Sequence, residues 1–243
     1  MTFSSTRAVA VYCGASIGTE PAFVHAATSL GHGLAASNRP LVYGAGSQGI
    51  MGRVSGAVLE QGGHVTGIIP QAMLAAGGEG DKTVDAREGQ LEGEKLVRLD
   101  EGRRERVETI VTHSMHERKV EMARRVCGFI GLPGGFGTFE EVLEVVTWTQ
   151  IGIHSKPVII LNVLGFYDPL RDLVQGAIRR GFIRPDSESI LVFVDGPADH
   201  AEHATFDWGA AGLVALEGWS GAPAGYFKWP SEKEQHKEGL QLS

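Results

Sequence analysis

The sequence predicts an α/β protein built on one doubly wound, mostly parallel β-sheet with helices on both faces. Seven apolar runs of strand length alternate with helix-length amphipathic segments along the 243 residues. The runs are continuously apolar, as expected for strands that are covered on both faces. The 34 glycines are spread along the chain, often where an apolar run ends, which is typical of strand-to-helix turns.

The strands are expected at residues 8–14, 40–46, 63–70, 106–112, 126–133, 156–162 and 189–194. The helices between them are expected at residues 20–37, 48–61, 115–125, 138–151 and 168–180. This alternation predicts a single domain over residues 1–217. Residues 75–105 are rich in glycine and charge and predict a surface insertion. Residues 218–243 carry four aromatic side chains, so we expect a C-terminal tail that packs onto the domain or a partner.

Composition excludes several classes of function. The net charge of −7 disfavours a nucleic-acid-binding protein. The two cysteines, Cys13 and Cys127, lie in apolar runs and predict buried, reduced thiols. No run approaches the roughly 18 apolar residues of a membrane span, so we expect a cytoplasmic protein without a membrane partner. His200 and His203 have no further Cys or His cluster beside them, and we expect no metal site.

A first glycine-rich turn, "YGAGSQGIMG" at residues 43–52, has the spacing G-x-G-x-x-G after an expected strand. NAD binding also requires an acidic residue at the end of the next strand, and "HVTGIIPQA" has none, which disfavours a dehydrogenase. Two interpretations remain open. The turn exposes helix N–H groups that hold an anion, or its glycines only allow close packing of strand and helix.

A second glycine-rich turn, "LPGGFGTFEE" at residues 132–141, follows another expected strand. It lacks the Lys-Ser/Thr pair of a phosphate-binding P-loop ATPase. Its three glycines allow a ligand to approach the backbone closely. Thr138 and Glu141 also have the spacing of a helix capping box. Because a cap does not explain three glycines and a proline, we favour a ligand site.

The helix expected at residues 115–125 places two cations on an apolar face. Arg118 and Lys119 share that face with Met115 and Met122. The cations either extend their charged ends into water or point at a phosphate or a carboxylate, which an arginine binds with two parallel hydrogen bonds. We favour the second interpretation.

"MHERK" (115–119) followed by "PGGFGTFEE" (133–141) resembles the signature of the "Lonely Guy" (LOG) family. These proteins are cytokinin riboside 5′-monophosphate phosphoribohydrolases, formerly described as lysine decarboxylases. "VYCGAS" (11–16), "EVVTWTQIGIHSKPVIILN" (144–162) and "GFYDPL" (165–170) are also similar to family segments, so the resemblance covers residues 8–200 apart from the expected insertion.

The resemblance implies a Rossmann-like fold, a homodimer with its active site near the subunit interface, and a nucleoside 5′-monophosphate substrate without a cofactor. It implies that Arg118 and Glu141 are catalytic. The substrate-binding residues it implies are Lys119, Gly134, Gly135, Phe136, Gly137, Thr138, Phe139, Glu140, Thr147, Gly46, Ser47 and Met115. The sequence departs from the family pattern at Ala45, where glycine is commoner, and at Ser114, where many members have aspartate. Glu88 is a candidate for a substrate contact within the insertion.

The implied reaction is hydrolysis of the N-glycosidic bond of an N6-modified AMP, which releases the free base and ribose 5-phosphate. Its transition state resembles an oxocarbenium ion. Glu141 is expected to stabilise that charge and to orient or deprotonate water, Arg118 to keep Glu141 ionised, and Lys119 with the turn amides to bind the phosphate. No lysine suits a pyridoxal phosphate aldimine. A general AMP or purine-nucleotide nucleosidase and a non-catalytic nucleotide sensor remain alternatives.

Overall fold

The computed structural model describes residues 7–75, 106–223, 225, 227 and 229. Within them, seven strands form one sheet in the order β4-β3-β2-β1-β5-β6-β7, and every neighbouring pair is parallel. The strands are β1 (Val9–Tyr12), β2 (Leu41–Tyr43), β3 (Val65–Pro70), β4 (Val107–Thr112), β5 (Gly128–Gly131), β6 (Val158–Leu161) and β7 (Leu191–Val194). The predicted fold class is confirmed.

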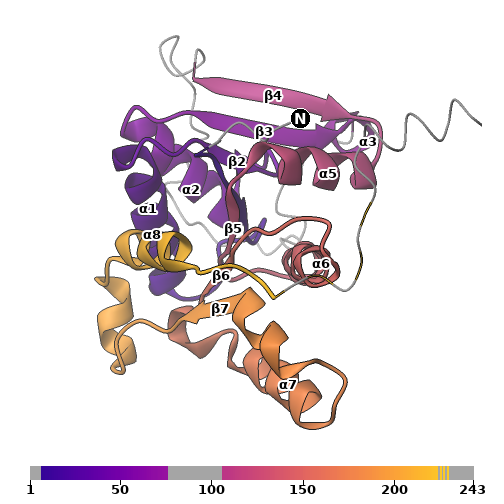
Figure 1. Cartoon of the computed structure of the whole chain (residues 1–243). Coiled ribbons are helices and arrows are strands. Elements are labelled where there is room, and N and C mark those ends of the chain that lie inside the picture. Colours follow the sequence, from indigo (N-terminus) through magenta and orange to yellow (C-terminus); the bar gives the residue numbers. More distant parts are fainter. Residues whose placement is uncertain (1–6, 76–105, 224, 226, 228, 230–243) are drawn as a thin grey trace, which may run out of the picture.

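Helices cover both faces of this sheet (Figure 1). One face carries α1 (Pro21–Ala36), α2 (Gly49–Glu60) and α8 (Trp208–Gly218), and the other carries α5 (Met115–Arg125), α6 (Phe136–Ile151) and α7 (Asp168–Arg179). The short helix α3 (Gln71–Ala75) follows β3. Three 3₁₀ turns, η1 (Val163–Gly165), η2 (Pro185–Ile190) and η3 (His200–Ala204), complete the described elements.

The central strand β1 shows why the strands are apolar without alternation. Val9 and Val11 pack into the core beneath α1, α2 and α8. Ala10 and Tyr12 pack into the separate core beneath α5, α6 and α7. Successive side chains of a strand point to opposite faces, and here both faces are buried, so every position of the strand must be apolar.

The strand order reverses at β1, which lies between β2 and β5. In open α/β sheets, ligands bind outside the carboxyl ends of the strands at such a reversal. The segments that leave β1, β2 and β5 at this edge include both glycine-rich turns. The topology therefore brings together the two motifs that the sequence analysis identified separately.

Some elements differ from the sequence prediction. Helix α8 was not predicted, because its small residues give no clear amphipathic period, yet Trp208, Leu213 and Leu216 are buried. Strand β4 is largely exposed because it is an edge strand that pairs only with β3. Helix α6 begins two residues earlier than predicted, at Phe136.

Four further expectations concern the insertion, the C-terminal segment, the cysteines and membrane spans. The expected insertion at 75–105 lies outside them apart from Ala75, and so does Glu88. In the C-terminal segment, Trp219 Nε1 donates to the Ser189 carbonyl at 2.9 Å, and Trp229 Nε1 donates to the Ile151 carbonyl at 2.9 Å. Both cysteines are free thiols, but only Cys13 is buried as predicted, and Cys127 is partly exposed. Over the part of the chain that is described, no helix has the length and apolar character needed to cross a bilayer.

Candidate active site

A cavity of about 360 Å³ opens at the carboxyl ends of β1, β2 and β5. Part of its wall is the end of β1 and the loop that follows, with Cys13, Gly14 and Ala15. Gly44 follows β2, and methionines from three helices add an apolar lining. The opposite wall is the start of α6, from Gly135 to Glu141, and Arg118 of α5.

A buried ion pair lies in this cavity. Arg118 is only 3% exposed, and its Nη2 atom lies 3.5 Å from Oε1 of Glu141, whose side chain is 12% exposed. Nη1 of Arg118 also contacts the sulfurs of Met73 and Met115, at 3.9 and 3.7 Å. The cation on the apolar face of α5 is thus buried against a carboxylate and does not extend into water.

Gly44 makes room for this guanidinium. A Cβ atom built at Gly44 would lie 2.1 Å from Arg118 Nη2. No side chain fits there while Arg118 keeps its position, so this glycine of the first turn makes room for the Arg118–Glu141 ion pair.

The second glycine-rich turn forms the start of α6 and opens onto the cavity. Gly135 is the N-cap residue and has no side chain, while Thr138 is already the third helical residue. The capping-box interpretation of Thr138 and Glu141 is therefore wrong, and Glu141 is not engaged as a cap. The N–H groups of the first helical turn have no acceptor inside a helix, and Gly137 and Thr138 of this turn line the cavity.

The glycines of the second turn have two different roles. Cβ atoms built at Gly135 and Gly137 would meet no atom within 4 Å, so the backbone there is open to a ligand. A Cβ atom at Gly134 would lie 2.2 Å from Thr138 Oγ1 and 2.8 Å from the Gly14 amide nitrogen. Gly134 therefore allows this turn to pack against the loop after β1.

The first glycine-rich turn is closed to an anion. The amides of Ile50 and Met51, in the first turn of α2, donate to the carbonyls of Ser16 and Gly14, at 3.4 and 3.2 Å. Gly49 has φ of +61°, and a Cβ atom there would lie 2.1 Å from the Ala15 carbonyl oxygen. The structure thus favours the packing interpretation of this turn. Gly46 lies against Met51, Ser47 is exposed, and neither lines the cavity.

Lys119 forms a second link between α5 and α6. Its ammonium group lies 2.5 Å from Glu140 Oε1 and 3.0 Å from Glu144 Oε1, and its side chain is 13% exposed. Burial lowers the pKa of Lys119, but the hydrogen bonds to the two carboxylates outweigh burial, so its pKa is raised. Lys119 does not line the cavity, although Glu140 does.

The other predicted substrate-binding residues lie outside the cavity of this chain. Phe136 is 91% exposed, and Phe139 packs against the rings of Phe166 and Tyr167. Thr147 is exposed and its hydroxyl donates to the Leu143 carbonyl at 2.8 Å. The structure thus brings together Arg118, Glu141, Met115, Gly135, Gly137, Thr138 and Glu140, and leaves Phe136, Phe139 and Thr147 apart from them.

Several residues of the site were not predicted individually. Gly14 belongs to "VYCGAS", which carried part of the family resemblance, so a signal for it existed. Met73 lies on the short helix α3, where the sequence shows no pattern. Tyr12 is fully buried, and burial raises its pKa well above the usual value, with further increases from Glu141 and Glu144. Its phenol therefore stays protonated near the carboxylates.

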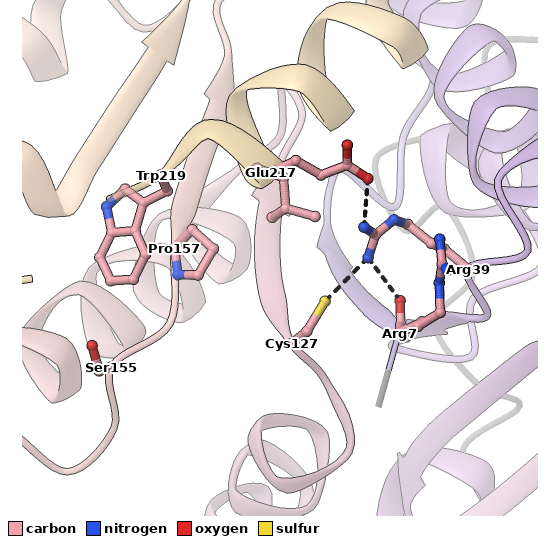
Figure 2. A pocket seen from close by; sticks show the side chains of 8 residues that line it. Arg7, Arg39, Cys127, Ser155, Pro157, Glu217 and Trp219 are labelled. Atoms are coloured by element: carbon pink, nitrogen blue, oxygen red, sulfur yellow. Dashed lines mark hydrogen bonds and ion pairs between the residues drawn. The ribbon is translucent and has the colours of Figure 1, made fainter. Parts of the chain in front are cut away.

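A larger pocket, of about 670 Å³ (Figure 2), lies beside the amino ends of the strands, opposite to the cavity at their carboxyl ends. Its cations are already engaged. Arg39 bonds Glu217 at 2.6 Å, the Cys127 sulfur at 3.5 Å and the Arg7 carbonyl at 3.3 Å. Trp219 and Pro157 lie across the pocket from this group (Figure 2). Because ligands of open α/β sheets bind at the carboxyl edge, we place the candidate active site in the smaller cavity.

Comparison with known proteins identifies related sequences. The family model described as "Possible lysine decarboxylase" matches residues 51–204. A relative from Oryza sativa subsp. japonica, named a probable cytokinin riboside 5′-monophosphate phosphoribohydrolase, is 44% identical over 82% of this chain and 72% of its own. The cytokinin riboside 5′-monophosphate phosphoribohydrolase LOG2 of Arabidopsis thaliana is 44% identical over 79% of each chain. The chain belongs to the LOG family.

Solved structures agree on the fold alone. The molybdenum cofactor binding protein of Rippkaea orientalis superposes with a TM-score of 0.50 at 18% identity, over 79% of this chain and 91% of that chain.

The structure accounts for the departure from the family pattern at Ser114 and gives the backbone conformation at the other departure, Ala45, of this LOG-family chain. Ser114 caps α5, since its side chain accepts from the Glu117 amide at 3.0 Å, and Glu117 in turn accepts from the His113 amide at 2.7 Å. Serine and aspartate are both good N-cap residues. Ala45 has φ of +65°, a left-handed conformation in which glycine is favoured.

Proposed function

We propose that the protein hydrolyses the N-glycosidic bond of cytokinin riboside 5′-monophosphates, which releases the free N6-modified adenine and ribose 5-phosphate. The observation that carries this proposal is the buried Arg118–Glu141 pair beside the open start of α6. The relatives at 44% identity bear the names of enzymes with this activity. Catalysis in the cytoplasm is part of the proposal, since free thiols suit a reducing compartment.

The start of α6 supplies the proposed phosphate site. The N-terminus of a helix carries a partial positive charge and unpaired N–H groups, which suit a phosphate. Gly135 and Gly137 leave the backbone accessible from the cavity. Binding energy from this phosphate positions the distant sugar and so contributes to the rate.

Glu141 is the proposed catalytic carboxylate. It lies in the second turn of α6, one turn beyond the proposed phosphate site, so that it faces the ribose when the phosphate is bound. As the bond between the anomeric carbon and the purine nitrogen breaks, positive charge develops on the sugar. The carboxylate stabilises this charge and accepts a proton from the attacking water, which is worth about 10²–10⁴-fold in rate, while the hydroxide bonds to the anomeric carbon. The departing purine nitrogen takes up a proton from solvent, and Glu141 returns its proton to solvent. Arg118 holds Glu141 in place through the ion pair.

A homodimer is part of this proposal. Phe136, Glu140, Leu143 and Thr147 recur at helical spacing along one side of α6. Phe136 is 91% exposed and Leu143 is 42% exposed, which leaves apolar surface next to the cavity. We place the dimer contact on this side of α6, so that Phe136 and Thr147 complete the site at the interface. Light scattering should give twice the chain mass, and Phe136→Asp should reduce it to the chain mass.

The test uses Glu141→Gln, which keeps the size of the side chain and removes its charge. Purified wild-type protein should release free base from N6-isopentenyl-AMP, measured by chromatography. The variant should lose at least about 10²-fold in kcat and should still bind AMP with nearly unchanged affinity. Unchanged turnover in the variant would sink the mechanism, and AMP binding without turnover in the wild type would favour a nucleotide sensor.

A further inference from the structure

We infer that Lys119 and Glu144 form a positioning pair for the Arg118–Glu141 pair, and that Lys119 is not a ligand of the substrate phosphate. The inference rests on the proposed function. It assigns a role to Glu144, the first residue of the family-like segment at 144–162, and replaces the phosphate-binding role expected for Lys119.

Two adjacent cations of α5 hold three carboxylates of α6. Arg118 contacts Glu141, and Lys119 contacts both Glu140 and Glu144. Glu140 and Glu144 lie one turn apart on α6, and Glu141 lies between them in the sequence. The Lys119 links therefore fix the segment of α6 that carries Glu141 at a set distance from the helix that carries Arg118.

Lys119 is poorly placed to bind a phosphate. Its ammonium group already has two carboxylate partners, at 2.5 and 3.0 Å, and its side chain is largely buried. It is absent from the lining of the cavity, and Glu140 stands in that lining instead. The charge of Lys119 is therefore already compensated by carboxylates of α6.

The carboxylate of Glu144 depends on Lys119 for its compensating positive charge. Its second carboxylate oxygen, Oε2, is buried and has no hydrogen-bond partner among the described residues. Its other oxygen bonds Lys119. Glu144 also lies next to Glu141 along α6, three residues further on, and their partners Lys119 and Arg118 are adjacent on α5. Without Lys119, the Glu144 charge is uncompensated and competes with Glu141 for Arg118.

Four variants separate positioning from phosphate binding: Lys119→Met, Glu144→Gln, the double variant, and Lys119→Arg as the conservative control. The measurements are kcat and KM on N6-isopentenyl-AMP, and the inhibition constant of the product ribose 5-phosphate. Lys119→Met should lower kcat on the order of 10²-fold, as expected when a catalytic pair is displaced. The inhibition constant of ribose 5-phosphate should stay within about twofold of wild type, since the phosphate site is intact.

Removing both charges should restore activity. The double variant Lys119→Met/Glu144→Gln should recover to within about tenfold of the wild-type kcat, because no uncompensated carboxylate remains to draw Arg118 away. Lys119→Arg should keep kcat within about tenfold of wild type, because it keeps the charge. A general loss of packing would give no such recovery in the double variant.

The inference is overturned if Lys119→Met raises KM and the ribose 5-phosphate inhibition constant together while kcat stays unchanged. It is also overturned if the double variant is no more active than Lys119→Met. Failure of the proposed function has a different signature, because the wild-type protein itself would then release no base.

Discussion

The two glycine-rich turns look alike in the sequence and lie at the same edge of the sheet, but they have opposite uses. The turn after β2 donates the first amides of α2 to the carbonyls of Gly14 and Ser16. The turn after β5 places the first residues of α6 in the wall of the cavity. The amides of the first turn are bonded to carbonyl groups of the protein, whereas the second turn is open to a ligand.

The loop after β1 makes this difference. Its carbonyl groups face α2 and take the hydrogen bonds that an anion would need. Towards α6 the same loop meets Gly134, which allows close contact and leaves Gly135 and Gly137 uncovered. A glycine-rich turn before a helix is therefore an anion site only where no other segment of the chain supplies acceptors to its amides. The comparison predicts that substitution of Gly49, which packs against the loop after β1, reduces stability, and that substitution of Gly137, which is open to the cavity, reduces substrate binding.

The largest effect is expected at Gly49 of the first turn. Gly49→Ala combines a left-handed backbone with a Cβ contact of 2.1 Å to a carbonyl oxygen that cannot move away cheaply. The free energy of unfolding should fall by about 2–5 kcal/mol, measured by urea denaturation. The matched control is Gly56→Ala in the same helix, where a Cβ atom meets nothing within 4 Å, so that stability should hold or rise by up to about 1 kcal/mol. Equal stability of the two variants would remove the distinction between the turns.

Gly44→Ala should act on catalysis more than on stability. Its Cβ would lie 2.1 Å from Arg118 Nη2, the flexible end of a side chain, which must move off Glu141. We expect kcat to fall on the order of 10²-fold, while the free energy of unfolding changes by about 1 kcal/mol or less. Steady-state kinetics and urea denaturation of the same preparation check this. Wild-type kcat in a folded Gly44→Ala protein would contradict the role given to Arg118.

Gly137→Ala probes the open turn. Its Cβ meets no protein atom within 4 Å, so folding should be unaffected or stabilised by up to about 1 kcal/mol. The added methyl group projects where the phosphate is proposed to bind, and KM for the monophosphate should rise about tenfold, equivalent to roughly 1.4 kcal/mol. A destabilised protein with unchanged KM would mean that the second turn, like the first, serves packing.

The smallest effect is expected at Ala45, where the first turn lacks a glycine that its backbone favours. Ala45→Gly relieves the left-handed conformation at φ of +65° but adds chain entropy to the unfolded state. The net gain in the free energy of unfolding should be about 0.5–1 kcal/mol by urea denaturation. The contrasting variant is Ala57→Gly in the interior of α2, which should lose about 1 kcal/mol or more. Loss of stability at both positions would show that Ala45 carries no backbone strain.

The structural features that depend on a local pattern of residues could be predicted from the sequence. All seven strands were located because each is a mainly apolar run, and those between the edge strands β4 and β7 are buried on both faces. The pairing of Arg118 with Glu141 was also foreseen, since a cation on the apolar face of a helix requires a partner. The family resemblance supplied the identity of that partner.

Features that depend on distant contacts were not predictable. The hydrogen bonds that close the first turn come from Gly14 and Ser16, more than 30 residues earlier in the chain. The start of α6 was misplaced because Thr138 resembles a cap, while the N-cap is Gly135, which has no side chain. Met73 and Glu144 join the site only through the packing of α3 and of α6 against α5, which no local pattern records.

The central claim is that the open turn holds the phosphate that positions the sugar against Glu141. The most direct test compares base release from N6-isopentenyl-AMP and from its unphosphorylated riboside, by chromatography with the same wild-type preparation. The account predicts rapid release from the monophosphate and at least about 10²-fold slower release from the riboside, because a substrate that lacks the phosphate loses its positioning energy. Equal rates on the two substrates would contradict the account.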